Sequence, residues 1–89
     1  MAILIVDDSP DQHLLLRSIL TKAGHDQIVA VDSARGAFTT LNVDGEQSPL
    51  KVDLILLDVL MPDIDGVSAC RRIKQQAPLR DIPIIMVTA

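Results

Sequence analysis

Three aspartates stand directly after two apolar runs of this sequence. Asp7 and Asp8 follow the run Ala2–Val6, and Asp58 follows the run Leu54–Leu57. If these runs are neighbouring strands of a parallel sheet, their carboxyl ends meet at one edge and the three carboxylates crowd together. Like charges in a half-buried pocket repel and raise the pKa of each carboxyl group, and a bound divalent cation relieves that repulsion. Because all the side-chain ligands would be oxygens, the pattern favours a hard ion such as Mg²⁺.

A purely structural explanation of the same aspartates also exists. Aspartate is common after strands because it caps turns and helix starts, so for Asp7 and Asp8 alone both explanations stay open. Capping accounts less well for acids at the same end of two separate strands. The turn Met61-Pro62-Asp63, which follows Asp58 closely, adds weight to the functional interpretation.

The elements that would position these acids are short apolar runs alternating with longer amphipathic segments. Runs of this kind between helical segments are typical of parallel strands in βαβ units, buried on both faces. The expected strands are Ala2–Val6, Ile28–Val31, Leu54–Leu57 and Ile82–Val87. Crossovers between parallel strands are right-handed almost without exception, which makes the first and third strands neighbours and predicts the order 2-1-3-4. Ligands of such open sheets bind beyond the carboxyl ends of the strands, where the order reverses.

Three helices are expected between the strands. The first begins with Ser9 as its cap and Pro10 in its first position, and ends at Gly24. The second covers Ser33 to about Leu41, the segment Asn42–Lys51 is expected to be a loop, and the third begins near Asp65 or Gly66 and ends at Pro78. On the first helix, one face is shared by Leu16, Ile19, Leu20 and Ala23. The third helix is expected to bury Val67, Cys70 and Ile73 and to turn Arg71, Arg72 and Lys74 toward water.

Composition limits the classes of function. The chain has 89 residues, which allows at most one domain. Its net charge of −4 and its single aromatic residue, Phe38, argue against nucleic-acid binding by this chain itself. The single Cys70 excludes an internal disulfide and suits a reducing compartment. The N-terminal apolar run is too short for a signal peptide, and no stretch approaches the roughly 20 apolar residues of a membrane span. We therefore expect a cytoplasmic protein without membrane contact.

Three blocks of the sequence resemble the receiver domains of two-component response regulators, over the whole chain and in the right order. They are Ile5-Val6-Asp7-Asp8-Ser9, the stretch Leu54–Gly66 with its Asp-x-x-Met-Pro-x-x-Asp-Gly pattern, and Ile82–Ala89 with its Val-Thr-Ala ending. The resemblance implies an α/β fold of the flavodoxin-like, doubly wound type. It also implies a signalling module rather than an enzyme, although receivers catalyse their own phosphorylation and dephosphorylation.

The resemblance further assigns roles around a magnesium ion. Asp8 and Asp58 would bind Mg²⁺ through their carboxylates, and Asp7 would hold a metal-bound water. The backbone carbonyl of Leu60 would complete the protein ligands.

The resemblance also assigns the phosphoryl chemistry. Asp58 would accept a phosphoryl group from a phosphohistidine of a sensor histidine kinase or phosphotransfer protein. Thr88 would contact the phosphoryl oxygens and carry the switch, and Ala89 would leave room beside it. An output domain in a longer chain would read the switch.

The sequence departs from the receiver pattern at its end. Receivers continue through a fourth helix, a fifth strand that ends in an active-site lysine, and a fifth helix, none of which stands within these residues. We therefore expect residues 1–89 to form a partial receiver domain, in which the four strands alternate with the three helices and the fifth strand and the last two helices are lacking. Its last strand would then be an edge open to association.

Two rival functions are poorly supported, and one stays open. Phosphatases of the haloacid dehalogenase type need an acid two residues after the nucleophile, where this chain has Leu60. A dinucleotide site needs glycines after the first strand, and none is present there. The open alternative is a receiver-like interaction module that is not phosphorylated in this form.

The other residues singled out near the predicted site have structural explanations. Pro62 and Gly66 would shape the turn after Asp58, and Asp65 would cap the third helix. His13 is expected to be a surface or packing residue without a catalytic role.

Overall fold

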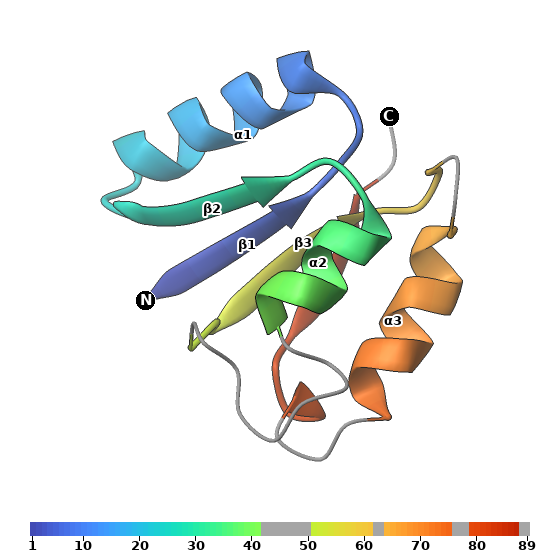
Figure 1. Ribbon diagram of the computed structural model, residues 1–89. Coiled ribbons are helices and arrows are strands. Elements are labelled where there is room, and N and C mark those ends of the chain that lie inside the picture. The colour runs from blue at the N-terminus through green and yellow to red at the C-terminus, as the bar shows by residue number, and fades with distance from the viewer. Residues whose placement is uncertain (42–50, 62–63, 76–78, 88–89) are drawn as a thin grey trace.

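The computed structural model describes residues 1–41, 51–61, 64–75 and 79–87 (Figure 1). Strands and helices alternate along these residues. The elements are β1 (Ala2–Val6), α1 (Pro10–Lys22), β2 (Gln27–Val31), α2 (Ala34–Leu41), β3 (Leu54–Asp58), α3 (Gly66–Lys74) and β4 (Ile84–Val87). Residues 42–50 of the expected loop, and Pro78 of the expected helix stop, lie outside the described part of the chain.

The strands form one parallel sheet in the order β2-β1-β3-β4. This confirms the predicted order and the flavodoxin-like, doubly wound fold class. The register pairs Val6 of β1 with Val31 of β2 on one side and with Leu57 of β3 on the other. Because β1 and β3 are parallel neighbours in this register, the residues that follow β1 emerge level with the end of β3.

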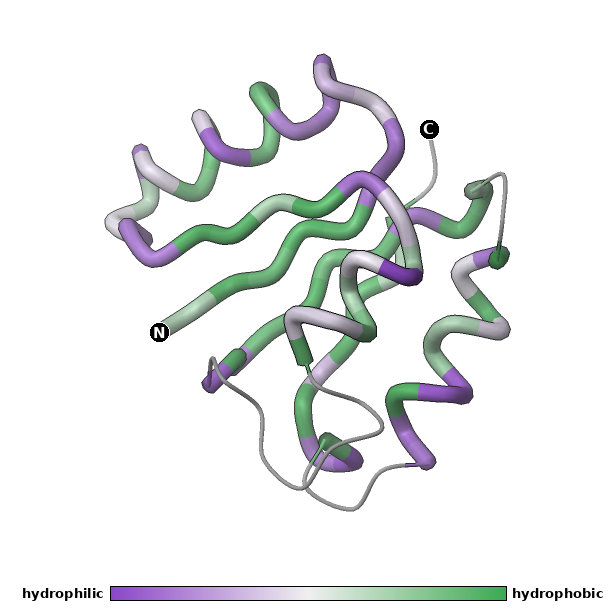
Figure 2. Tube along the Cα trace, in the orientation of Figure 1, coloured by the Kyte–Doolittle hydropathy of each residue, from purple (hydrophilic) through white to green (hydrophobic). Residues whose placement is uncertain are grey.

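Helices cover both faces of the sheet, with α1 on one face and α2 and α3 on the other (Figure 1). Alternate strand residues point to opposite faces, and this divides the core in two. The larger half joins strand residues such as Leu4 and Leu57 to Leu41 of α2 and Ile73 of α3. The smaller half joins Ile3, Ile5 and Leu56 to the α1 side chains Leu16 and Leu20. The strands are accordingly apolar along most of their length (Figure 2).

The predicted apolar face of α1 is partly wrong. Leu16 and Leu20 pack against the sheet, but Ile19 is 53% exposed and Ala23 is also exposed. Leu16 and Leu20 are four residues apart and stack on one line of the helix, whereas Ile19 lies about 100° from Leu20 around the axis. The helix therefore contacts the sheet along a narrow stripe, and no α1 residue is fully buried.

The predicted buried face of α3 also needs correction. Val67 is 50% exposed and Cys70 is half-buried, while Gly66, Ala69 and Ile73 form the buried line. This line follows the i, i+3, i+7 spacing of a helix face, and Val67 is turned about 100° away from Gly66.

Lys74 does not point freely into water, contrary to expectation. Its Nζ atom donates hydrogen bonds to the carbonyl oxygens of Arg80, at 2.8 Å, and Ile82, at 2.5 Å. Lys74 thereby ties the end of α3 to the segment that leads into β4. That strand begins at Ile84 rather than Ile82, because the Ile82 amide donates to the Leu79 carbonyl in a turn and Pro83 has no amide hydrogen to give.

None of the helices in the described ranges is both long and apolar enough to cross a membrane.

Candidate functional site

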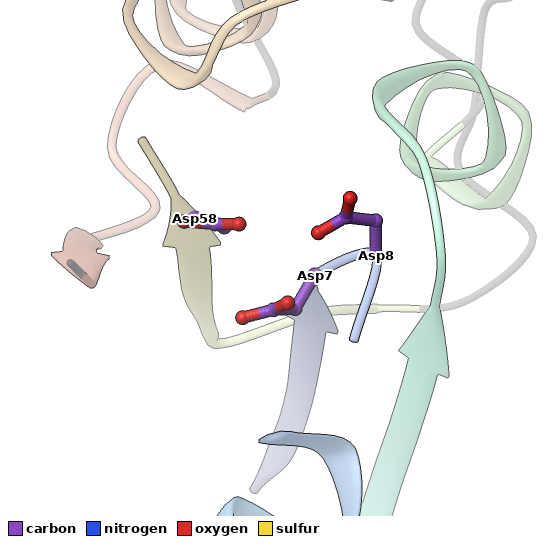
Figure 3. Close-up of side chains that lie close together, drawn as sticks. All are labelled: Asp7, Asp8 and Asp58. Carbon is purple, nitrogen blue, oxygen red and sulfur yellow. The ribbon is translucent and has the colours of Figure 1, made fainter. Parts of the chain in front are cut away.

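The three predicted aspartates meet at the carboxyl ends of β1 and β3. One carboxylate oxygen from each of Asp7, Asp8 and Asp58 lies within 4.8 Å of the others. Figure 3 shows Asp7 and Asp8 at the end of β1 and Asp58 at the end of β3, with their carboxylates directed into the space between the strands. Asp7 is 5% exposed and Asp58 is 8% exposed, whereas Asp8 is exposed to solvent. The expected convergence of the acids is present in the structure.

Asp7 and Asp58 are held by the same local device. The Ser9 amide donates to Oδ1 of Asp7 at 2.9 Å, and the Leu60 amide donates to Oδ1 of Asp58 at 3.2 Å. In both cases the side chain accepts from the main chain two residues ahead, which is an Asx turn. Each turn orients its carboxylate at the point where the chain leaves the sheet.

The acids line a hollow of about 210 Å³. Its lining residues are Asp7, Asp8, Ser9, Gln12, Asp58 and Leu60. All three carboxylates and the predicted main-chain ligand, Leu60, thus belong to one concave surface. The hollow has room for a small ion that keeps several waters, as Mg²⁺ does in sites with few protein ligands. The Leu60 side chain itself is 77% exposed.

The electrostatics of the cluster favour a bound cation. Burial raises the pKa of Asp7 above its ordinary value, and the nearby charges of Asp58 and Asp8 act in the same direction. The Ser9 amide, and to a smaller extent His13, oppose the rise in the pKa of Asp7. A divalent cation between the acids would favour their ionised forms and so relieve the repulsion.

The first residue of α3, Gly66, contacts the main chain at the end of β3. The Gly66 amide donates to the Val59 carbonyl at 2.9 Å, in keeping with the predicted turn-shaping role of Gly66. Asp65 caps α3, as expected: its Oδ1 accepts from the Ser68 amide at 2.8 Å. This hydrogen bond is the main reason why the pKa of Asp65 lies below its ordinary value. Pro62 lies outside the described residues.

Thr88 and Ala89, which complete the predicted site, also lie outside the described residues. The last described residue of β4, Val87, is the register partner of Asp58, and its carbonyl accepts from the Val59 amide at 3.2 Å. The prediction that Thr88 contacts a phosphoryl group on Asp58 therefore stays a prediction.

Sequence reasoning missed one neighbour of the site. Nε2 of His13 lies 2.6 Å from the carbonyl oxygen of Asp7. The signal was the position of this histidine, on the first turn of the helix that follows the paired acids, from which a side chain can reach back to the turn.

Comparisons with known proteins agree on one family. Residues 3–89 match the family described as the response regulator receiver domain. The chain is 37% identical over 87 residues to the DNA-binding dual master transcriptional regulator RpaA of Synechocystis sp., covering 98% of this chain and 33% of that protein. It is 35% identical over 86 residues to protein PilH of Pseudomonas aeruginosa, covering 97% of this chain and 65% of PilH. The chain thus spans a third to two thirds of the length of these two relatives.

Solved structures give the same result. The signal receiver domain of a signal transduction histidine kinase from Syntrophus aciditrophicus superimposes with a TM-score of 0.86 at 41% identity, covering 98% of this chain and 61% of that one. The receiver domain of the sensor histidine kinase PA1611 from Pseudomonas aeruginosa superimposes with a TM-score of 0.81 at 31% identity, covering 99% of this chain and 66% of that one. The PA1611 structure has a magnesium ion coordinated in its active site cleft. With a parallel sheet in the order β2-β1-β3-β4 and three acids at the ends of its central strands, this chain belongs to the response regulator receiver domain family of two-component signal transduction.

Proposed function

We propose that this chain is a phospho-acceptor and that Asp58 takes the phosphoryl group from a phosphohistidine. The observation that carries the proposal is the convergence of Asp58 with Asp7 and Asp8 in one hollow at the switch point of the sheet. Asp58 supplies a carboxylate nucleophile, and the other two acids supply the charge that attracts a cation. The donor would be a sensor histidine kinase or a phosphotransfer protein.

The transfer is a single displacement at phosphorus. A carboxylate oxygen of Asp58 forms a bond to phosphorus while the bond from phosphorus to the donor's histidine nitrogen breaks. The nitrogen keeps the bonding electron pair, and the product on this chain is an acyl phosphate. A carboxylate is a weak nucleophile, so the reaction depends on positioning and on neutralisation of charge. The Leu60 amide contributes positioning, because it holds Oδ1 of Asp58.

The donor set suits Mg²⁺ because every predicted ligand atom is an oxygen. Asp8 and Asp58 would bind the ion through their carboxylates, the Leu60 carbonyl would complete the protein ligands, and Asp7 would hold a metal-bound water. When bound, the ion neutralises negative charge on the transferring phosphoryl group.

The later events would involve the end of β4 and other parts of a longer protein. We propose that the Thr88 hydroxyl contacts the phosphoryl oxygens and carries the switch, and that Ala89 leaves room beside it. Residues 1–89 would act as a partial receiver domain in the cytoplasm. The switch would be read by an output domain, and the greater length of relatives such as RpaA supports its presence.

The test is phosphorylation of the full-length protein with acetyl phosphate and Mg²⁺. One phosphoryl group should add about 80 Da, and peptide mapping should place it on Asp58. Asp58→Asn should abolish the adduct, whereas Asp11→Asn, which changes an exposed acid on the first turn of α1, should not. A wild-type protein that gains no mass would favour the receiver-like interaction module instead, and an adduct on Asp7 or Asp8 would refute the assignment of Asp58.

A further inference from the structure

His13 makes a short hydrogen bond to the main chain of the acidic site. Its ring is half-buried on the first turn of α1, and Nε2 lies 2.6 Å from the carbonyl oxygen of Asp7. A carbonyl oxygen only accepts hydrogen bonds, so Nε2 must carry the hydrogen. The ring therefore acts as a donor to Asp7, whether or not its other nitrogen is protonated.

This hydrogen bond completes a set that holds Asp7 from three directions. The Asp7 amide donates to the Val31 carbonyl of β2 at 3.1 Å, and Oδ1 of Asp7 accepts from the Ser9 amide at 2.9 Å. The His13 ring holds the remaining main-chain group, the carbonyl. The His13 amide in turn donates to the Ser9 carbonyl at 3.1 Å, so the donor ring sits on a helix turn that is itself fixed.

The carbonyl of Asp7 matters because it belongs to the peptide group that joins Asp7 to Asp8. That group is planar, so fixing its oxygen fixes the direction in which the chain continues into Asp8. Asp8 is exposed to solvent, unlike Asp7 and Asp58. The direction of the Asp8 carboxylate therefore depends on the main chain that carries it more than on packing around its side chain.

We propose that His13 is a positioning residue of the cation site: its Nε2–H holds the Asp7–Asp8 peptide group so that both carboxylates face Asp58. The inference rests on the proposed function, because it takes the acidic cluster to be a Mg²⁺ site. This positioning role and a simple packing role of His13 make different predictions. If His13 acts by donating its hydrogen bond, only a side chain with a donor at the position of Nε2 should preserve Mg²⁺ binding.

Two polar substitutions separate these roles. The side-chain nitrogen of glutamine stands the same number of bonds from Cα as Nε2 of histidine, so His13→Gln keeps a donor within reach of the Asp7 carbonyl. The nitrogen of asparagine matches Nδ1 instead, so His13→Asn is equally polar but too short. His25→Asn is the matched control, because His25 is the only other histidine of the chain and lies beyond the far end of α1.

The experiment is a Mg²⁺ titration of the full-length protein at one fixed pH, followed through the amide signals of Asp7, Asp8 and Asp58. Loss of a group that orients metal ligands typically weakens metal binding about 10- to 100-fold. We expect His13→Asn to weaken Mg²⁺ binding about 10-fold, and His13→Gln and His25→Asn to stay within about twofold of wild type. Thermal unfolding without Mg²⁺ checks that the His13→Asn protein is folded.

A second readout needs no metal. The Asp8 amide signal of the Mg²⁺-free protein should move in His13→Asn and stay near its wild-type position in His13→Gln. Equal Mg²⁺ affinity in wild type and His13→Asn would overturn the inference, and so would equal weakening in the Asn and Gln variants, which would indicate ring packing. If wild type itself gave no Mg²⁺ shift, the proposed cation site would be wrong, and the metal-free comparison would still decide whether His13 holds the peptide group.

Discussion

Gly66 packs directly against the main chain that carries Asp58. A Cβ atom on Gly66 would overlap the Asp58 carbonyl oxygen and lie 2.8 Å from the Cα atom of Val59. The obstructing atoms belong to the backbone, so they cannot move aside as the end of a side chain could. The absence of a side chain at Gly66 therefore allows the start of α3 to lie against the main chain of Asp58, the predicted phospho-acceptor.

This contact predicts a functional effect of Gly66→Ala. The methyl group should push the Asp58–Val59 main chain, lower the free energy of unfolding by about 2 kcal/mol, and slow phosphorylation by acetyl phosphate at least several-fold. Gly24→Ala is the control: Gly24 has a φ of +97° and nothing within 4 Å of an added Cβ. That variant should lose stability through backbone strain but keep the wild-type rate per folded molecule. Equal rates in the two variants would contradict the proposed role of the Gly66 contact.

Asp8→Ala should remove most of the cation affinity. Asp8 contributes one of the three carboxylates of the cluster, and its side chain lines the hollow. We expect Mg²⁺ to shift the amide signals of Asp7, Asp58 and Leu60 in wild type, and the dissociation constant to rise at least about 10-fold in Asp8→Ala. Asp11→Ala should leave the titration unchanged. An Asp8→Ala protein that titrates like wild type would show that the ion binds elsewhere.

Asp7→Asn should stabilise the Mg²⁺-free protein at neutral pH. The pKa of Asp7 is raised in the folded state, mainly by burial and then by its acidic neighbours. The stability that the Asp7 carboxyl group contributes is thus present in full below its unfolded-state pKa of about 3.9. It is lost as the pH rises through the raised folded-state pKa of the same group. Asparagine carries no charge there and can still accept from the Ser9 amide. We expect the free energy of unfolding of Asp7→Asn to exceed that of wild type by about 1 kcal/mol at neutral pH, and this difference to vanish in acid.

Urea denaturation of the Asp7→Asn protein at acid and neutral pH checks that pH dependence. Saturating Mg²⁺ should narrow or reverse the difference in stability between Asp7→Asn and wild type. A ligand stabilises the folded protein that binds it, and wild type should bind Mg²⁺ more tightly than the variant. A gain in stability that is the same in acid and at neutral pH would rule out the charge of Asp7 as its cause.

Leu60→Asn should shorten the lifetime of the phosphoryl group. Leu60 stands two residues after Asp58, lines the same hollow and is 77% exposed, so its apolar side chain can screen an acyl phosphate from water. Asparagine could instead orient an attacking water. The measurement is the decay of the about 80 Da adduct after excess acetyl phosphate is removed, and we expect several-fold faster loss in Leu60→Asn. Equal or slower loss in the variant would refute the screening role.

A polypeptide of residues 1–89 should associate through β4. Among the described strands β4 pairs with β3 alone, and its side chains Ile85 and Met86 are 52% and 36% exposed. An apolar edge strand with free main-chain groups recruits another strand. Sedimentation at micromolar concentration should show a dimer or larger species, which Ile85→Lys should reduce. Leu14→Lys, which changes a 68% exposed apolar residue of α1, should not. A strictly monomeric polypeptide with slow amide exchange across Ile84–Val87 would contradict this prediction.

The sequence alone was enough to predict the sheet and the acidic site. Each strand is a short apolar run that ends at a polar or small residue, and the right-handed crossover rule leaves little choice of strand order. Once β1 and β3 are neighbours, the residues after Val6 and Leu57 must emerge at the same edge. The convergence of Asp7, Asp8 and Asp58 follows from that topology, with no knowledge of side-chain packing.

Tertiary structure decided which side of each helix meets the sheet. A helical pattern narrows the buried face to an arc, and the docking angle and distance then select within that arc. The result is that Ile19 and Val67 are exposed, against the prediction, while Leu20 packs on the sheet and Ile73 is buried.

Tertiary structure also decided which long polar side chains donate hydrogen bonds to the main chain. Lys74 reaches the carbonyls before β4, and His13 reaches the carbonyl of Asp7. Spacing along the chain shows only that such a contact is within reach, as the position of His13 on the first turn of α1 does, because a long or ring-bearing side chain can also point to water. In the folded arrangement a carbonyl oxygen lies at hydrogen-bond distance from each donor, and the free energy of satisfying that oxygen selects the contact.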